Sequence, residues 1–392
     1  MPESSHSRIT LLSYITYALT NVIETLLRLF PFPTKTGLVL IGDPDRMAPV
    51  LLTCNYHLTV QRVKRQLTGI DAYLLIATSQ GVNVWCSATG GLLTNHSVIS
   101  VLKTSGIEKL VDHRNVILPQ LAAAGVEPRV IRRKTGWSAK FGPVYIEDIK
   151  HFLKSGEKDE SMRKVQFDVK QRLEMASAWA FPLSVVAVLV VLPFWAEMLL
   201  PLTLIIWGLA LSIFLPFPLY ARWLKHKDKR IGLIFFDFHQ GGFLLIIWGL
   251  FLAGLAIWSL LSGGFHWEPF LRWAISSFFV MLILSLDLMG STPLYKSSLH
   301  EDRLFSVVID KDKCRGAGLC HDVCPRGCFQ VDRRRHIAAI TQAHLCVQCG
   351  ACIVQCPFDA LSFHSPDGRI IPPHAIRKYK LNLMGKRVSK SQ

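Results

Sequence analysis

Charged side chains are scarce in this sequence. Only 18% of its 392 residues are charged, against about 25% in soluble domains, and 50% are hydrophobic. Acidic residues are the rarer sign, 28 against 44 basic ones, which leaves a formal net charge of +16. These values exclude a neutral soluble globule and an acidic disordered chain. They favour an anionic partner, such as nucleic acid, a membrane surface or an anionic ligand.

Cysteine is also sparse, and its distribution excludes a disulfide scaffold. Ten cysteines are too few to hold a chain of this length together by disulfides. Eight of the ten lie between Cys314 and Cys356. Such clustering indicates metal binding.

The net charge is divided unevenly along the chain. It is +7 over residues 1–176, +1 over residues 177–290 and +8 over residues 291–392. The chain therefore divides into a polar front, a nearly uncharged middle and a basic tail. No segment has the pattern of a nucleic-acid-binding module, so we expect no nucleic-acid partner. Membrane lipid with anionic headgroups suits two basic ends that flank an apolar middle.

The middle segment contains three uncharged runs, each longer than the roughly 20 residues that cross a bilayer. They cover residues 175–196, 198–221 and 238–267. A fourth run, residues 270–290, carries Arg272 and Asp287 near its ends. We therefore expect an α-helical bundle of four spans within residues 175–292.

Basic residues between the second and third spans set the expected orientation. Five of them crowd into residues 222–230, which predicts a cytoplasmic loop and places both ends of the chain on the cytoplasmic side of the cell (inner) membrane. A five-pass alternative, which splits the third run, would export the cysteine-rich tail. Within residues 1–36, the apolar stretch 9–30 has no signal-peptide cleavage site. It is either an amphipathic, membrane-associated helix or a further span.

The second half of the cysteine cluster is typical of bacterial ferredoxins. It reads C-x2-C-x2-C-x3-C-P, a run in which three cysteines hold one iron–sulfur cluster and the fourth ligates the other. The residues are Cys346, Cys349, Cys352 and Cys356, followed by Pro357. A zinc ribbon would instead need two separated C-x2-C pairs. The sequence predicts a small α+β dicluster ferredoxin domain over residues 300–370, with a basic tail at 371–392.

The first half of the cluster departs from this pattern, because Ala317 stands where the second cysteine belongs. The ferredoxin pairing then gives one complete 4Fe-4S site and one site with three cysteines. The complete site takes Cys324, Cys346, Cys349 and Cys352, and the other takes Cys314, Cys320 and Cys356. A three-thiolate site holds a 3Fe-4S cluster or recruits an outside ligand. Cys328 is the candidate for that ligand, and the alternative is a bystander thiol.

Residues 37–174 predict an α/β, Rossmann-like domain, because strand-like and helix-like pieces alternate along them. The strand-like pieces are 37–42, 49–54 and 72–78, the helical ones are 58–67 and 97–104, and 115–118 and 146–154 follow. This rhythm favours a mostly parallel sheet with helices on both faces. Its ligand should lie at the carboxyl ends of the strands, where residues 53–56 and 81–91 form two loops.

The second loop contains Cys86, which from spacing alone would be taken for a buried structural thiol. The loop, however, resembles the signature of the corrinoid protein of mercury methylation, N-[V/I]-W-C-[A/S]-[A/G]-G-K, whose partner is a two-cluster ferredoxin. The matching residues are Asn83, Val84, Trp85, Cys86, Ser87 and Ala88. The resemblance extends over residues 37–175, including 53–56, 117–121 and 142–144. More remotely, the front domain is similar to the corrinoid iron–sulfur protein of acetyl-CoA metabolism.

The resemblance implies a corrinoid (cobalamin-like) cofactor, with residues 82–88 as a short cap helix beneath the corrin ring. It implies that Cys86 is the catalytic residue and lower cobalt ligand. The further implied contacts are Thr53, Asn55, Asn83, Val84, Trp85, Ser87 and Ala88. A soft thiolate is a strong donor to cobalt. Opposite a methyl group, it stabilises the Co(III) that remains if the methyl leaves as a carbanion, the form that an electrophile such as Hg(II) accepts.

The sequence as a whole thus predicts a membrane-anchored, corrinoid-dependent methyltransferase with a fused ferredoxin. Regeneration of Co(I) needs strongly reducing electrons, which iron–sulfur clusters can supply. The expected partners are a methyl-folate-type or methyl-corrinoid-protein donor, a low-potential electron donor and Hg(II). Two departures weaken mercury as the substrate. Residues 89–91 replace the Gly-Lys of the signature. The partner ferredoxin of the family ends with a cysteine pair suited to handing over Hg(II), and no cysteine follows Cys356 here. The alternative function is a membrane-bound iron–sulfur electron carrier without corrinoid methyl transfer.

Overall fold

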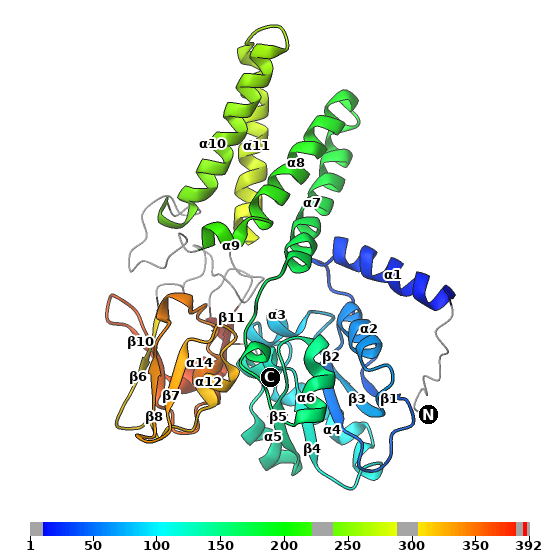
Figure 1. Cartoon of the computed structure of the whole chain (residues 1–392), viewed down its shortest axis with the longest axis vertical. Coiled ribbons are helices and arrows are strands. Elements are labelled where there is room, and N and C mark those ends of the chain that lie inside the picture. The colour runs from blue at the N-terminus through cyan, green and yellow to red at the C-terminus, as the bar shows by residue number, and fades with distance from the viewer. Residues whose placement is uncertain (1–10, 222–237, 288–304, 382–386, 390–392) are drawn as a thin grey trace. The chain divides into compact units, whose positions relative to one another are not determined.

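The computed structural model of the chain describes residues 11–221, 238–287, 305–381 and 387–389 (Figure 1). The chain forms two compact units. One unit, residues 1–21, 30–165 and 300–392, contains the front domain and the ferredoxin domain. The other, residues 22–29 and 166–299, contains the long apolar helices. The predicted succession of an α/β domain, four span-length helices and a small β-containing domain is confirmed.

A five-stranded sheet with the order β1-β3-β2-β4-β5 forms the front domain. Its strands are β1 (Gly37–Ile41), β2 (Val50–Cys54), β3 (Ala72–Ala77), β4 (Asn115–Leu118) and β5 (Ser138–Phe141). Strand β2 runs parallel to β3 and β4, and β4 runs parallel to β5. Strand β1 is antiparallel to β3 at one edge. The mostly parallel sheet is therefore confirmed, with β5 as a strand that the sequence pattern did not reveal.

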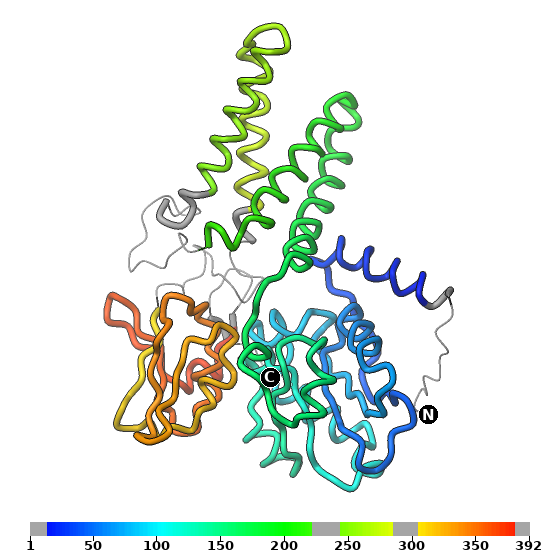
Figure 2. Tube along the Cα trace, viewed as in Figure 1, coloured from blue at the N-terminus to red at the C-terminus, as the bar shows by residue number. Residues whose placement is uncertain are grey.

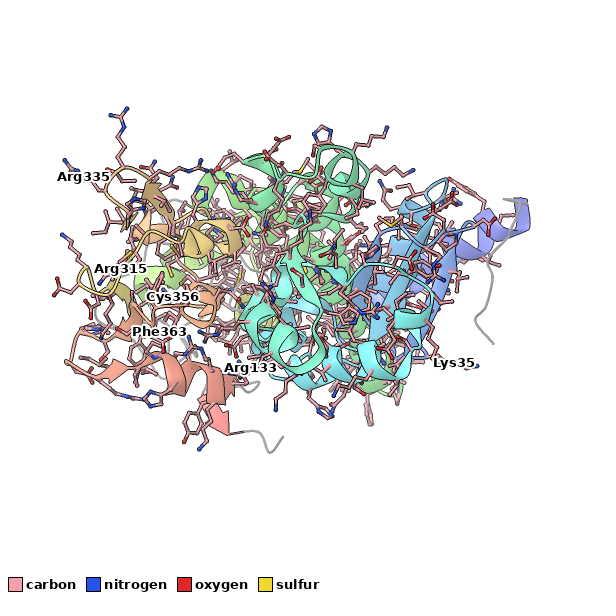
Figure 3. All side chains as sticks on the ribbon, turned by 90° about the horizontal axis from the view of Figure 1, so that it is seen from below. Lys35, Arg133, Arg315, Arg335, Cys356 and Phe363 are labelled. Atoms are coloured by element: carbon pink, nitrogen blue, oxygen red, sulfur yellow. The ribbon has the colours of Figure 1, made fainter. Side chains whose placement is uncertain are left out.

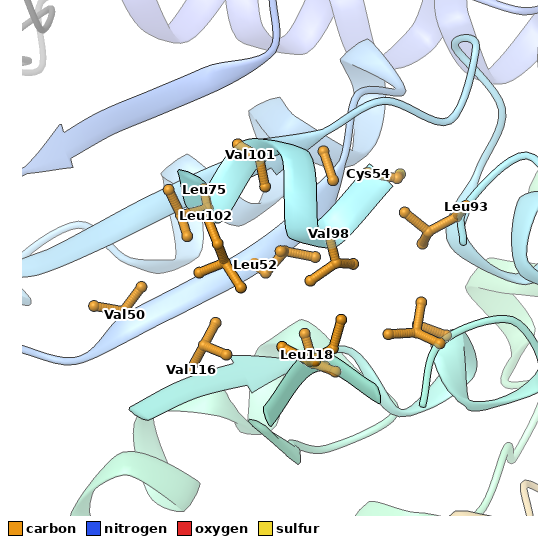
Figure 4. Close-up of a cluster of buried hydrophobic side chains, with 14 of the residues drawn as sticks. Val50, Leu52, Cys54, Leu75, Leu93, Val98, Val101, Leu102, Val116 and Leu118 are labelled. Carbon is orange, nitrogen blue, oxygen red and sulfur yellow. The ribbon is translucent and has the colours of Figure 1, made fainter. Parts of the chain in front are cut away.

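Helices cover both faces of this sheet, because alternate residues of the central strands point to opposite sides. Leu52 of β2 packs in a cluster with Val98, from α4 (Asn95–Thr104), and with Leu118 (Figure 4). Its neighbour Leu51 packs in the other cluster with Val63, from α2 (His57–Gln66). The remaining elements are η1 (Ile107–Lys109), η2 (Gln120–Ala124), α5 (Pro128–Thr135), η3 (Ile146–Asp148), α6 (Ile149–Ser155) and η4 (Ser161–Arg163).

Four helices of the second unit are long and apolar enough to span a membrane, as predicted. They are α7 (Val169–Val191), α8 (Leu199–Phe214) with η5 (Ala196–Met198), α10 (Phe238–Leu261) and α11 (Trp267–Asp287), and the short α9 (Phe217–Tyr220) follows α8. Figure 2 shows α7 with α8 and α10 with α11 as two helical hairpins. Leu189, Leu200 and Leu261 are 71%, 69% and 83% exposed, as expected of lipid-facing side chains. The basic loop 222–230 lies outside the described residues.

The N-terminal apolar stretch forms the helix α1 (Leu11–Leu26), which has 16 residues in the described part. This length is below the roughly 20 residues of a span. Ile15, Leu19, Val22 and Ile23 are exposed and share one face, at intervals of four, three and one. Tyr14 and Tyr17 instead lie against the guanidinium of Arg65, 5.5 and 5.2 Å from their ring centroids. The described part of this helix therefore carries one exposed apolar face.

The ferredoxin domain combines small sheets with short helices that carry the cysteines. A three-stranded sheet has the order β10-β9-β6, and β7 and β8 form a hairpin. The elements are β6 (Ser306–Ile309), α12 (Leu319–Val323), β7 (Phe329–Asp332), β8 (Ile337–Ile340), η8 (Ala343–Leu345), α13 (Ala351–Gln355), β9 (Leu361–His364), β10 (Ile370–Ile371), α14 (Pro373–Lys378), β11 (Tyr379–Leu381) and β12 (Arg387–Ser389). Phe363 is fully buried in its core, close to Cys356 (Figure 3). Helix α14 and strand β11 continue beyond the predicted boundary at residue 370.

Candidate cofactor sites

A short helix with a cysteine follows β3, at the carboxyl edge of the parallel strands. This cap helix, α3 (Val84–Thr89), begins after Asn83, whose Oδ1 accepts a hydrogen bond from the Cys86 backbone N–H at 3.0 Å. The Asn83 Nδ2 donates to the Cys86 Sγ at 3.5 Å. Cys86 is partly exposed, whereas Trp85 and Ser87 on either side are buried. The fold thus presents one sulfur at the edge where α/β domains bind their ligands.

Asn55 organises the loop that leads into the cap helix. Its Oδ1 accepts from the backbone N–H groups of Ser79 and Gly81, at 2.8 and 3.0 Å. Its Nδ2 donates to the Thr34 carbonyl at 3.1 Å. Asn55 is 5% exposed, so its amide is committed to the loop. Sequence reasoning missed Ser79, a fully buried serine whose Oγ lies 3.0 Å from the same Oδ1, because a loop serine carries no distinguishing pattern.

Gly81 allows a second segment to close over this loop. Its φ is +72°, a conformation that favours glycine. A Cβ at this position would lie 2.5 Å from the Pro33 nitrogen. The backbone N–H of Phe32 donates to the Gly81 carbonyl at 3.0 Å, which fixes the approach.

Exposure divides the expected corrinoid contacts into two groups. Asn83, Val84 and Cys86 are partly exposed. The buried members are Thr53, Asn55, Trp85, Ser87 and Ala88. The second group therefore shapes the loops and the helix from within.

The ferredoxin pairing predicts that Cys324, Cys346, Cys349 and Cys352 share one cluster, and we call them the four-cysteine group. Burial raises the pKa of the Cys352 thiol well above its usual value, and the charges of Cys349, Cys346 and Cys324, and also that of Cys320 from the other predicted group, add to this. A thiol that resists ionisation by itself is readily deprotonated when it binds a metal. The group brings one cysteine of the first half together with three of the second.

Cys328 lies beside the four-cysteine group. Its side chain contacts those of Cys324 and Cys346, and its backbone N–H donates to the Cys324 Sγ at 3.3 Å. The hydrogen bond from the Cys328 side chain lowers the pKa of Cys324 to about 6, and it raises the pKa of Cys328 itself. This position does not favour the expected role of Cys328 as a ligand of the three-cysteine site.

Cys314, Cys320 and Cys356, the three-cysteine group, line one pocket together with Ala317. Burial raises the pKa of Cys320 to about 12, with added effects from the charges of Cys356 and Cys314. All the residues that line the pocket lie between Ile309 and Leu361, and thus in the ferredoxin domain. Because alanine has no metal-binding atom, the position of Ala317 leaves this group one ligand short of four.

Both groups suit iron–sulfur clusters. Among the described residues, no three His, Cys, Asp or Glu side chains are placed to hold a single metal ion. The thiolates of a cluster each bind a different iron, so they stand farther apart than the ligands of one ion. The backbone N–H groups of Ala338 and Ala360 donate to the sulfurs of Cys314 and Cys356, both at 3.4 Å. Hydrogen bonds of this kind adjust the potential of a bound cluster.

Known proteins resemble two parts of the chain. Residues 11–153 match the family described as CO dehydrogenase/acetyl-CoA synthase delta subunit, and residues 342–362 match the 4Fe-4S binding domain. The acetyl-CoA decarbonylase/synthase complex subunit gamma of Methanopyrus kandleri is 35% identical over 125 residues, which are 31% of this chain and 27% of that protein. The same subunit of Methanothermobacter thermautotrophicus is 36% identical over 125 residues, 31% of this chain and 27% of that protein.

The matched region is short in proportion to these relatives, since the chain spans about a quarter of their length. The family match over residues 11–153 covers the sheet, the cap helix and the loops around it. The expected likeness to the corrinoid iron–sulfur protein of acetyl-CoA metabolism is thereby confirmed, as is the 4Fe-4S-binding character of the tail.

Proposed function

We propose that this chain, which carries a corrinoid iron–sulfur protein domain at its front and a 4Fe-4S-binding domain in its tail, is a membrane-anchored methyl carrier with its own reductant. One observation supports this above all others. Cys86 is a partly exposed sulfur at the carboxyl edge of a parallel sheet, held at its backbone and at its Sγ by Asn83. A purely structural thiol in this fold would resemble Cys54, which is fully buried in the sheet.

The cap-helix residues divide the work of holding the corrinoid. When bound, the corrinoid supplies a cobalt centre that carries a methyl group. Cys86 would hold the lower face of that cobalt through its thiolate, a soft donor that suits a transition metal. Asn83 fixes the direction of the sulfur, and the partly exposed Val84 adds an apolar contact beside it. Trp85 is buried and anchors the helix to the domain.

The two cysteine groups would supply the electrons. We assign a 4Fe-4S cluster to the four-cysteine group and a 3Fe-4S cluster to the three-cysteine group, where Ala317 offers no fourth ligand. Cys328 remains a protonated thiol beside the first cluster, in keeping with its raised pKa. Low-potential clusters in the same chain suit a corrinoid that must return to Co(I).

The membrane would hold both domains on the cytoplasmic side. The basic loop 222–230 sets this orientation by the positive-inside rule. The exposed apolar face of α1, formed by Ile15, Leu19, Val22 and Ile23, would lie in the membrane surface. The reaction then proceeds where low-potential electron donors are available.

The methyl group would come from a methyl-folate-type or methyl-corrinoid-protein donor. The acceptor would be an electrophile that takes the methyl as a carbanion, and Hg(II) belongs to this chemical class. Residues 89–91 differ from the Gly-Lys of the mercury-methylation signature. The acceptor is therefore best identified by assay.

Cofactor analysis of the purified, detergent-solubilised protein tests this function. After reconstitution with corrinoid, we expect one cobalt per chain and the absorption of a sulfur–cobalt bond. Cys86→Ala should lose that absorption and the methylation of Hg(II), whereas the control Cys54→Ala, which removes a buried thiol from the same domain, should keep the absorption. Iron without bound cobalt would instead identify an electron carrier. Cobalt with unchanged spectra in Cys86→Ala would refute the ligand assignment.

A further inference from the structure

One side of the ferredoxin domain is built into the core of the front domain. Val323 and Ala351, 1% and 3% exposed, belong to the same apolar cluster as Ala123 and Val126, and the partly buried Cys349 packs against that cluster. These residues are neighbours or members of the four-cysteine group. Val323 precedes Cys324 in the chain, Ala351 precedes Cys352, and Cys349 is a member of the group itself.

A buried glutamine holds this junction together. Gln355, the last residue of α13, is 6% exposed. Its Nε2 donates to the backbone carbonyls of Ala123 and Val126, both at 2.7 Å. Both hydrogens of the amide are thus used, and both acceptors belong to the front domain. From the same side of the junction, the Lys380 Nζ donates to the Ala124 carbonyl at 3.1 Å.

Residues 123–126, which include both acceptors of the Gln355 amide, pack directly against the cap helix. A Cβ at Gly125 would come within 2.7 Å of the Ala88 carbonyl oxygen and 2.4 Å of the Leu93 carbonyl oxygen. Ala88 is fully buried and lies two residues after Cys86 in α3. A continuous path of packed backbone therefore leads from α13, through residues 123–126, to the helix that carries the predicted cobalt ligand.

The three-cysteine group is linked to the front domain through residues beside its cysteines, since His321, next to Cys320, lies 3.6 Å from Glu160 and Gln355 directly precedes Cys356. Its pocket is lined by the ferredoxin domain alone, and none of its cysteines is in the front-domain cluster. Leu319 and Phe358 on its lining are 38% and 45% exposed. The two groups thus differ in surroundings, one built into the front domain and the other bordered by exposed side chains.

We propose that the four-cysteine group delivers the electron to the corrinoid, and that Gln355 is the positioning residue that holds this group to the cap helix. The inference rests on the proposed function. The four-cysteine group would hold the cluster that donates one electron, and Cys86 would hold the corrinoid, which would supply the Co(II)/Co(I) couple that accepts it. A low-potential one-electron donor from outside then reduces the cluster again.

Gln355→Glu tests the positioning role, because it keeps the size of the side chain and replaces both donor hydrogens by an acceptor that faces two carbonyls. The full chain, loaded with corrinoid and clusters, is mixed with Ti(III) citrate, and the Co(II) EPR signal is followed by rapid freezing. We expect its decay to slow at least tenfold, with cluster potentials and cluster EPR unchanged. Gln330→Glu, at an exposed position of β7, is the matched control and should decay as the wild type does.

Two ligand variants test which group delivers the electron. Cys349→Ser disturbs the four-cysteine group and should abolish the decay of the Co(II) signal from pre-reduced protein in a single turnover. Cys320→Ser disturbs the three-cysteine group and should slow that single turnover far less than Cys349→Ser does. The opposite pattern, or an unchanged decay in Gln355→Glu, would overturn the inference. A wild-type chain that binds no corrinoid would instead refute the proposed function.

Hydrogen–deuterium exchange on the corrinoid-free protein gives a readout that does not depend on turnover. In Gln355→Glu we expect faster exchange in residues 84–93 and 120–126, and unchanged exchange in α2. Lys380→Met, which removes the adjacent contact with Ala124, provides a milder variant if Gln355→Glu fails to fold. Protection of residues 84–93 that does not respond to either variant would contradict the coupling.

Discussion

Asn83 holds Cys86 at two points, since its amide oxygen accepts from the Cys86 backbone N–H at 3.0 Å and its amide nitrogen donates to the Cys86 Sγ at 3.5 Å. The first contact caps the helix, and the second is a polar donor aimed at the sulfur. One side chain thus sets both the start of the cap helix and the surroundings of its cysteine.

Exchange of Asn83 for aspartate should separate these two roles. Asp accepts from the backbone N–H as well as Asn does, so we expect Asn83→Asp to retain helix stability, whereas Asn83→Ala should lose about 1 kcal/mol. Asp cannot donate to the sulfur, and its negative charge opposes a thiolate. Alkylation of Cys86 by iodoacetamide at neutral pH should therefore be slower in Asn83→Asp than in the wild type. Equal rates would show that the contact with Sγ has no chemical effect.

Ala317→Cys should complete the three-cysteine group. Ala317 shares a pocket with Cys314, Cys320 and Cys356, so a thiol introduced there can supply the fourth ligand. The three-iron EPR signal of the oxidised protein should disappear, and the iron content should rise. Ala317→Ser is the control, because a hydroxyl is a poor ligand to iron in a cluster. A four-iron centre already present in the wild type would contradict the assignment.

Cys328→Ala should change the four-iron centre alone. The Cys328 thiol donates to Cys324, and a donor to sulfur stabilises the more negative, reduced cluster. Its removal should lower the reduction potential of that cluster, measured by an EPR-monitored redox titration. The three-iron signal serves as the internal reference and should keep its midpoint. A change confined to the three-iron signal would instead identify Cys328 as the outside ligand of the three-cysteine site.

Lys158 and Asp322 should respond unequally to mutation. The Lys158 Nζ lies 2.8 Å from Asp322, and its side chain is only 6% exposed. Burial lowers the pKa of this lysine. Asp322→Ala leaves the buried Lys158 ammonium without its counter-charge and should lower the free energy of unfolding by about 1–3 kcal/mol. Lys158→Met removes the buried ammonium itself and should lower the free energy of unfolding by less. Urea unfolding of the two variants, monitored by hydrogen exchange in residues 156–165, gives the order.

Glu160 should make stability sensitive to acid. Hydrogen bonds from Lys164 and Arg163 lower its pKa from 4.5 to about 2. A depressed carboxyl pKa contributes stability above the unfolded value of 4.5, and this contribution is lost as the pH falls from 4.5 towards 2. The stability difference between the wild type and Glu160→Gln should therefore shrink over this range. A difference that does not depend on pH would show that Glu160 acts by packing alone.

The elements that the sequence predicted are those with continuous apolar runs. Every residue of β2 and β3 is buried, which is typical of central parallel strands. The sequence did not predict strand β5, because Ser138 and Lys140 are exposed and the strand lacks a continuous apolar run. The sequence did not predict helix α5, because this helix is short and basic in its last turn. The cap helix was expected only from its resemblance to a known signature.

The candidate sites also contain some features that local sequence predicts and others that it does not. Cysteine spacing predicted the 4Fe-4S-binding character of the tail, because the C-x2-C-x2-C-x3-C-P run is typical of bacterial ferredoxins. It could not reveal the position of Cys328, which depends on how the chain folds back past Cys324. Nor could it reveal Gln355, whose acceptor Ala123 lies 232 positions earlier in the chain. Contacts of this kind arise from tertiary structure and leave no local pattern.

The crossed grouping of the cysteines has a consequence for biogenesis. Cys346, Cys349 and Cys352 are synthesised after Cys324, with which they are grouped. Cys356 is likewise synthesised after Cys314 and Cys320. Neither group is complete until the ribosome has translated the second half of the cysteine cluster, by which time the apolar helices before it have already emerged. On the proposed function, the apolar helices can therefore enter the membrane before either cluster can assemble. A cell starved of iron should accumulate this protein in the membrane with an unassembled tail.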